Sequence, residues 1–223
     1  ITEETRNYLN LNKIDIFFTK YKSKTIFKDR YSLYFEIIKN QLNIENIMLT
    51  DTADVIFFDD PFNNKLFSEI NFFLEDKTIA ECETNTRWIK RLYGNNVLNK
   101  INKNRISCSG ITLGKRENML EYCDLMVDEI KNFKYRSINP FSTGKGSDQG
   151  NHNKLINSSR YNTVKKFYNE DCFVVNISNS DPKIVEYRDN NFYINKRKVF
   201  VLHQYNSHEM IFKDVRNFIQ KIS

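Results

Sequence analysis

Short apolar runs alternate with stretches of helical periodicity along the whole chain, and this alternation restricts the fold more than any other feature. Runs with the character of buried strands lie at residues 14–18, 47–49, 55–58, 70–74, 173–176, 184–187, 192–194 and 199–202, and two extended pieces lie between 105 and 113. Apolar side chains recur at three- and four-residue intervals in segments 31–38, 85–93, 116–133 and 211–222, which predicts helices. Strands that alternate with helices form sheets covered by helices. We therefore predict an α/β domain whose central sheet is mixed, mostly parallel and flanked by helices.

The length of 223 residues suits one hydrophobic core, and we find no internal repeat or linker, so we expect a single domain over residues 1–223. The four cysteines, Cys82, Cys108, Cys123 and Cys172, form no CxxC pair, which argues against a zinc knuckle and indicates reduced thiols. No apolar run reaches the ~18 residues of a membrane span, and no signal peptide is visible. These features predict a cytoplasmic protein, and peripheral association with a membrane stays open.

The formal net charge of +6 suits a phosphorylated ligand, a nucleic acid or an anionic surface. The basic residues are scattered among acidic ones, however, as on an ordinary solvated surface. We find neither a nucleic-acid reader motif nor the Gly-rich loop of P-loop enzymes. We therefore do not expect a nucleic-acid partner.

Two carboxylates follow one apolar strand and directly precede the next, in the segment Thr50-Asp51-Thr52-Ala53-Asp54-Val55. In open α/β sheets this edge is where ligands bind. Carboxylate oxygens are the ligands that hard divalent cations prefer. Asp51 and Asp54 therefore indicate a site for Mg²⁺ or Mn²⁺, with a solvated turn as the plain alternative.

This segment, followed by Asp60-Pro61-Phe62, resembles the acidic signature of GT-A fold nucleotide-diphospho-sugar glycosyltransferases. In that family an Asp-x-Asp cluster binds a divalent metal together with the donor's diphosphate and ribose. Two residues separate the acids here instead of one, and a subset of these transferases is similar to this longer DxxD spacing. The resemblance covers roughly residues 29–205.

Three further segments occur in the order that this family has. Cys108-Ser109-Gly110 resembles the stretch that lines the donor sugar, which implies that Ser109 and Gly110 contact the donor. Ser147-Asp148-Gln149, with Asn153 after it, resembles the segment that holds the donor sugar in retaining galactosyltransferase-like and glycogenin-like enzymes. The resemblance implies catalytic roles for Asp148 and Gln149 and donor binding by Asn153. From the residues alone, Asp148 also predicts a helix N-cap at the end of a loop over 137–150.

His203 ends the last predicted strand, and the resemblance implies that it completes the metal site beside Asp51 and Asp54. Imidazole suits Mn²⁺ better than Mg²⁺. Arg30 lies where the family has a basic residue that braces the acidic motif, so it joins Asp51 among the expected donor-binding residues. Lys145 is a further candidate for phosphate binding, and Trp88 for stacking on a sugar.

The resemblance thus implies a metal-dependent glycosyltransferase that moves a sugar from a nucleotide-diphosphate donor, with UDP as the expected nucleotide, to a glycan, lipid or protein acceptor. The Asp148-Gln149 segment favours retention of configuration. Glu75, Glu81 and Glu83 are the alternatives as a general base in an inverting reaction.

Two rival classes stay open: a metal-dependent nucleotidyltransferase or phosphohydrolase, and a basic nucleic-acid-binding domain. The first strand of the family's fold, which holds the nucleotide base, is not found before Ile14. Either the sequence starts after that strand, or residues 14–18 form a later strand of the sheet.

Overall fold

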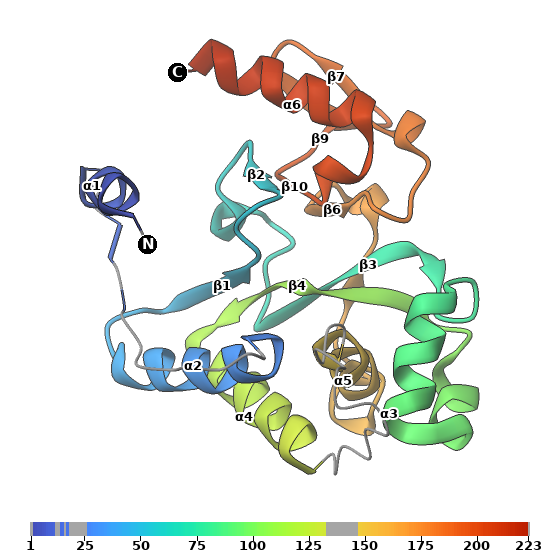
Figure 1. Cartoon of the computed structure of the whole chain (residues 1–223). Coiled ribbons are helices and arrows are strands. Elements are labelled where there is room, and N and C mark those ends of the chain that lie inside the picture. Colours follow the sequence, from blue (N-terminus) through green and yellow to red (C-terminus); the bar gives the residue numbers. More distant parts are fainter. Residues whose placement is uncertain (1, 12–13, 16, 18–25, 133–146, 223) are drawn as a thin grey trace.

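Figure 1 shows the computed structural model, which describes residues 2–11, 14–15, 17, 26–132 and 147–222. Over these residues the predicted α/β class is confirmed. The α-helices are α1 (Glu3–Leu11), α2 (Ile26–Asn40), α3 (Glu83–Ile101), α4 (Arg116–Asn132), α5 (Ser147–Ile156) and α6 (Glu209–Ile222). The strands are β1 (Asn46–Thr50), β2 (Val55–Phe57), β3 (Ile70–Thr78), β4 (Arg105–Lys115), β5 (Lys166–Phe167), β6 (Val174–Asn176), β7 (Glu186–Arg188), β8 (Asn191–Ile194), β9 (Arg197–Lys198) and β10 (Val201–His203).

The largest sheet has the strand order β1-β4-β3-β5, and helices α2, α4 and α5 cover one of its faces (Figure 1). β3 is buried on both faces, so its apolar residues run without alternation. Phe72 points into the core beneath the helices with Tyr31 and Met119. Phe73 points the opposite way, against Val174 and Val201 of the next sheet. Two hydrophobic cores therefore meet across β3.

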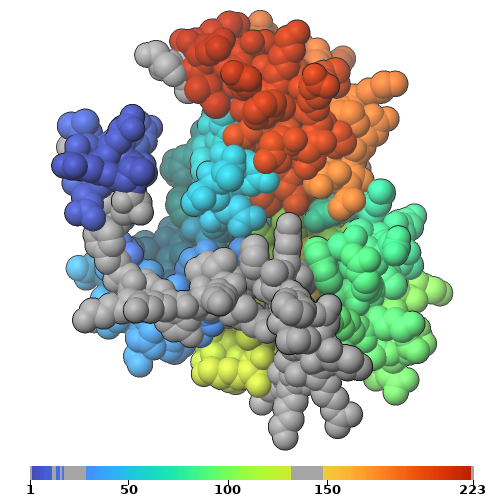
Figure 2. Space-filling model, viewed as in Figure 1, coloured from blue at the N-terminus to red at the C-terminus, as the bar shows by residue number. Residues whose placement is uncertain are grey.

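The second sheet has the order β2-β10-β6, and a third, β7-β8-β9, lies beside it. Helix α6 packs over them through Ile211 and Val215, and in Figure 2 it forms the upper surface of the molecule. The chain is thus layered as helices, large sheet, small sheets and α6. His203 lies at the end of β10 in the middle of this stack.

The prediction of a mostly parallel sheet is wrong. β4 runs antiparallel to both β1 and β3, and only β5 runs parallel to β3. In the second sheet β10 is antiparallel to β2 and parallel to β6. In a parallel pair the connecting helix returns the chain to the edge of the sheet where the first strand begins. Helix α3, two helical pieces joined by a kink at Gly94 where φ is 77°, instead brings the chain to the edge where β3 ends, because Arg105 at the start of β4 pairs with Thr78. β4 therefore runs antiparallel to β3.

Three local predictions also differ from the structure. Residues 105–113 belong to one continuous strand rather than two extended pieces. The loop predicted over 137–150 is wrong at its end, because residues 147–150 open α5; residues 137–146 lie outside the described residues. Ile14 and Phe17, from the run expected as a buried strand, are exposed and outside any strand, and the other apolar positions of that run are not described. The remaining predicted helices and strands are present within a few residues of their expected bounds.

Over the described residues, no helix combines the length and apolar character that crossing a bilayer requires. All four cysteine thiols are free, as expected for reduced cysteines.

Candidate functional site

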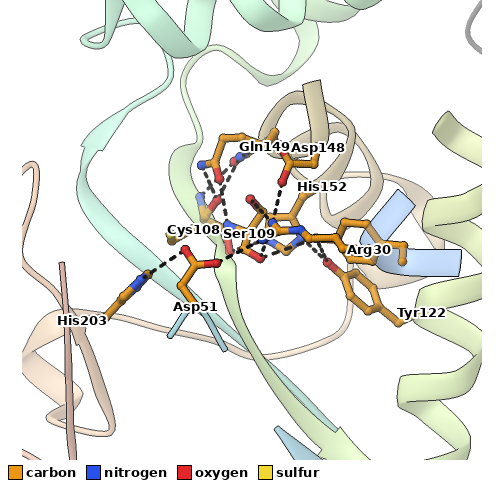
Figure 3. A network of polar contacts seen from close by, with 12 residues as sticks. Arg30, Asp51, Cys108, Ser109, Tyr122, Asp148, Gln149, His152 and His203 are labelled. Carbon is orange, nitrogen blue, oxygen red and sulfur yellow. Dashed lines mark hydrogen bonds and ion pairs between the residues drawn. The ribbon is translucent and has the colours of Figure 1, made fainter. Parts of the chain in front are cut away.

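The expected site residues from four elements gather at one place, which Figure 3 shows from close by. Arg30 comes from α2, Asp51 follows β1, Ser109 and Gly110 lie in β4, and Asp148 and Gln149 open α5. All six line one cavity of about 420 Å³. That volume is within the usual range for small-molecule sites.

Asp51, Asp54 and His203 lie together at the edge of this site. One ligand atom from each lies within 4.8 Å of the others, a spacing that suits a metal ion. The Nε2 atom of His203 is 3.7 Å from Asp51 Oδ2 and 3.7 Å from Asp54 Oδ1. Burial raises the pKa of Asp54, and nearby Asp51 raises it further against the opposing effect of His203. A cation between these groups would remove that repulsion.

The orientation of His203 indicates which ring nitrogen is free. Its Nδ1 lies 2.8 Å from Asn176 Oδ1, while the Asn176 amide nitrogen donates to the Phe73 carbonyl. The Asn176 oxygen therefore faces the ring and accepts a hydrogen bond from the Nδ1–H group. In the neutral ring Nε2 then carries a lone pair, and this buried atom has no hydrogen-bond partner within the described ranges. A buried lone pair that faces two carboxylates raises the free energy of the folded state, and a metal ion bound between them would interact favourably with all three groups. The donor set therefore fits a divalent cation, and the imidazole favours Mn²⁺.

Glycine is required at position 110 because the site closes tightly around it. A Cβ atom there would lie 2.4 Å from Asp51 Oδ2 and 2.7 Å from His203 Cε1. The backbone of Gly110 also accepts a 2.8 Å hydrogen bond from the Asp51 amide. β4 thus lets the carboxylate and the imidazole approach each other across its backbone.

Arg30 joins the acidic residues to β4. Its guanidinium lies 2.5 Å from Asp148 Oδ2 and 3.1 Å from Asp51 Oδ1, and it donates to both the carbonyl and the hydroxyl of Ser109 at 3.2 Å. The Arg30 and Asp148 side chains are 13% and 5% exposed, so their ion pair is largely desolvated. Burial raises the pKa of Asp148, and the Arg30 charge counteracts this shift. Asp51 keeps 43% of its side chain exposed, so it faces the cavity.

Gln149 and Asn153 hold the backbone of β4. The Gln149 oxygen accepts from the Ser109 amide and its nitrogen donates to the Ser107 carbonyl, both at 2.8 Å. Asn153 bonds the amide and the carbonyl of Ser107, is fully buried and is not among the residues that line the cavity. Both amides therefore position β4, and Asn153 does not reach the space where a donor would bind.

The cavity also contains residues that the sequence analysis did not assign. Gln204 lines it in a left-handed conformation with φ of 61°, and its position directly after His203 was the available signal. Glu75 lines it as well, 2% exposed, with its carboxylate bonded to Asn179. Burial raises the pKa of Glu75 to about 7, an effect that Asp76 increases and Asn179 and Lys77 oppose. The sequence analysis named Glu75, Glu81 and Glu83 as alternatives for a general base, and only the structure shows that Glu75 is the one that lines the cavity.

Trp88 lines the same cavity, whereas Lys145 lies outside the described residues.

Comparison with protein-family models and with curated proteins gives no match for this chain. The functional argument therefore rests on the geometry of the site.

Proposed function

We propose that the chain is a divalent-metal-dependent glycosyltransferase of the GT-A type, which takes a sugar from a UDP-sugar donor and passes it to an acceptor hydroxyl. One observation carries the proposal: Nε2 of His203, which has no hydrogen-bond partner among the described residues, faces Asp51 and Asp54 at the edge of the cavity. The α/β fold with a mixed sheet agrees with this class without singling it out.

The residues around the cavity suit an anionic, hydroxyl-bearing donor. Asp51, Asp54 and His203 would hold Mn²⁺ or Mg²⁺, which would stabilise the negative charge on the departing diphosphate. Arg30 keeps Asp51 and Asp148 in place through its two ion pairs. Ser109 and Asp148 line the cavity with oxygen atoms that can bond sugar hydroxyls.

The stereochemical expectation needs revision. Retention was expected from the Asp148-Gln149 segment, with Gln149 beside the reacting carbon. Both polar atoms of the Gln149 amide instead bond the backbone of β4. We therefore assign Gln149 a positioning role and do not include retention in the proposed function.

Calorimetric titration with UDP, with and without Mn²⁺, tests the proposal on the wild type and on Asp54→Ala. We expect Mn²⁺-dependent UDP binding that weakens at least about tenfold in the variant, since one ligand of the cation is lost. Asp128→Ala is the matched control, because Asp128 is an exposed carboxylate on α4 away from the cavity.

Two outcomes would contradict the proposal. A wild type that binds neither UDP nor GDP in the presence of Mn²⁺ has no nucleotide-sugar site. Binding that is equally strong without the metal would remove the role given to Asp51, Asp54 and His203.

A further inference from the structure

The cavity has two walls of different chemistry. The Arg30 wall consists of Arg30 from α2, Asp51 after β1, Ser109 from β4 and Asp148 at the start of α5. The Glu75 wall consists of Glu75, Thr84, Asn85, Trp88 and Asn179, from the end of β3, the start of α3 and the segment after β6. Figure 1 shows α3 on the opposite side of α5 from α2. The two walls thus face one cavity from different sides.

The Glu75 wall contains no basic side chain among the described residues that line the cavity. Thr84, Asn85 and Asn179 offer uncharged hydrogen-bonding groups beside the aromatic ring of Trp88. This combination does not suit a phosphate, which calls for cationic partners. It suits a neutral ligand with several hydroxyl groups and an apolar face.

The side-chain oxygen of Asn85 lacks a hydrogen-bond donor among the described residues. The side-chain nitrogen of Asn85 donates to the sulfur of Cys82, but its Oδ1 atom is buried and no described residue bonds it. The residue is only 5% exposed. A buried amide oxygen that lacks a donor is costly, and a ligand hydroxyl in the cavity would satisfy it.

Glu75 is the one acid of the three sequence candidates that reaches this cavity. Glu81 bonds the backbone and hydroxyl of Thr78, and Glu83 is exposed and pairs with Arg87. Neither of them lines the cavity. Glu75 is buried there, and no cation of the described part of the chain forms an ion pair with it, so its carboxylate is a strong proton acceptor when ionised.

We propose that the Glu75 wall is the acceptor subsite for a neutral sugar, and that the Glu75 carboxylate takes the proton from the attacking hydroxyl. This inference rests on the proposed glycosyltransferase function. Asn85 accepts a hydrogen bond from a second hydroxyl, and the Trp88 ring packs against the sugar. The proposed acceptor is therefore a sugar, whereas the sequence left glycan, lipid and protein acceptors open.

The reaction is a single displacement. The acceptor oxygen forms a bond to the anomeric carbon of the donor sugar as the bond from that carbon to the diphosphate oxygen breaks. The diphosphate leaves with the electron pair, and the acceptor proton moves to a carboxylate oxygen of Glu75. Attack from the face opposite the leaving group inverts the configuration.

The charged and titratable groups near Glu75 are Asp76 and Lys77 on β3, Cys108 on β4 and Cys82 before α3. Asp76 disfavours the Glu75 anion and Lys77 favours it, while burial has the largest effect and raises the pKa to about 7. The wild-type kcat should therefore rise with pH through about 7.

The test compares the wild type with Glu75→Gln, using UDP-glucose, UDP-galactose and UDP-N-acetylglucosamine as donors and methyl glycosides as acceptors. We expect the affinity of Glu75→Gln for UDP in the presence of Mn²⁺ to stay within about twofold of the wild type. Its kcat should be lower by about 100-fold or more, and the rise of kcat near pH 7 should disappear. NMR of the product should show an inverted anomeric configuration. Glu83→Gln, the charge-matched control, should behave as the wild type, and Trp88→Ala should raise the KM for the methyl glycoside about tenfold.

The outcomes separate this inference from the proposed function. Absence of Mn²⁺-dependent UDP binding by the wild type overturns both. Normal UDP binding with Glu75→Gln turnover within about threefold of the wild type, or with a retained anomeric configuration, overturns the inference alone. Normal UDP binding without transfer to any methyl glycoside overturns it too, because the subsite would then not accept a simple sugar.

Discussion

The two walls of the cavity satisfy their polar groups in opposite ways. On the Arg30 wall the guanidinium of Arg30 is paired with Asp51 and Asp148 before any ligand arrives. On the Glu75 wall the buried carboxylate has an amide for a partner, and Asn85 has an oxygen that no described residue bonds. A network of paired charges is rigid, and the loss of any one member destabilises the others. The protonation of an acid without a cationic partner instead changes with pH and with bound ligands. Substitutions on the two walls should therefore change stability in opposite directions.

The largest effect is expected for Arg30→Ala. This change leaves Asp148 buried without a cation, so the free energy of unfolding should fall by about 3–5 kcal/mol at pH 7. Urea unfolding measures it. Arg87→Ala, which removes an exposed i,i+4 pair, should change stability by less than about 0.5 kcal/mol. If the two variants were equally stable, the Arg30 wall would not be held by its ion pairs.

A smaller effect with the opposite sign is expected for Glu75→Gln. The pKa of Glu75 is raised from 4.5 to about 7 by folding, so this group's favourable contribution is complete below pH 4.5 and is lost as the pH rises through 7. Glutamine cannot ionise, so the variant should gain stability relative to the wild type between pH 4.5 and 8.5, by up to about 3 kcal/mol. Urea unfolding across this pH range measures the gain. A stability difference that does not change with pH would show that Glu75 ionises as freely in the folded chain as in the unfolded one.

A loss of stability smaller than that of Arg30→Ala is expected for Gly110→Ala, where the walls meet the metal ligands. The new methyl group would displace Asp51 and His203, costing about 2 kcal/mol and weakening Mn²⁺-dependent UDP binding about tenfold or more. Gly94→Ala is the control: its φ of 77° makes alanine strained, but no atom lies within 4 Å of the added carbon. Gly94→Ala should therefore lose stability and keep UDP binding. Equal UDP binding by both variants would contradict the close approach at Gly110.

The sequence predicted those features that depend on residues close together along the chain. Asp51 and Asp54 flank the turn between two apolar strands, so their residue types and positions predicted a metal site, and the family resemblance added His203 to it. The structure brings these three side chains together. Most helices and strands were likewise predicted, because their periodicity depends on neighbours along the chain.

What the sequence could not supply depends on contacts between distant segments. The direction of β4 depends on its pairing with β3, whose partner residues lie about 25 to 45 positions away in the chain. The separation of Glu75 from Glu81 and Glu83 depends on which of them the cavity encloses. The role of Gln149 depends on its reach to β4, which lies about 40 positions earlier in the chain.

The position of β10 has a consequence for how the protein is made. β10 is the middle strand of the second sheet, yet it follows both of its neighbours, β2 and β6, in the chain. During synthesis β2 leaves the ribosome long before the strand that it pairs with, and His203 is the last of the metal ligands to appear. The second sheet and the metal site are therefore completed in one late event, and a nascent chain that ends before β10 has neither.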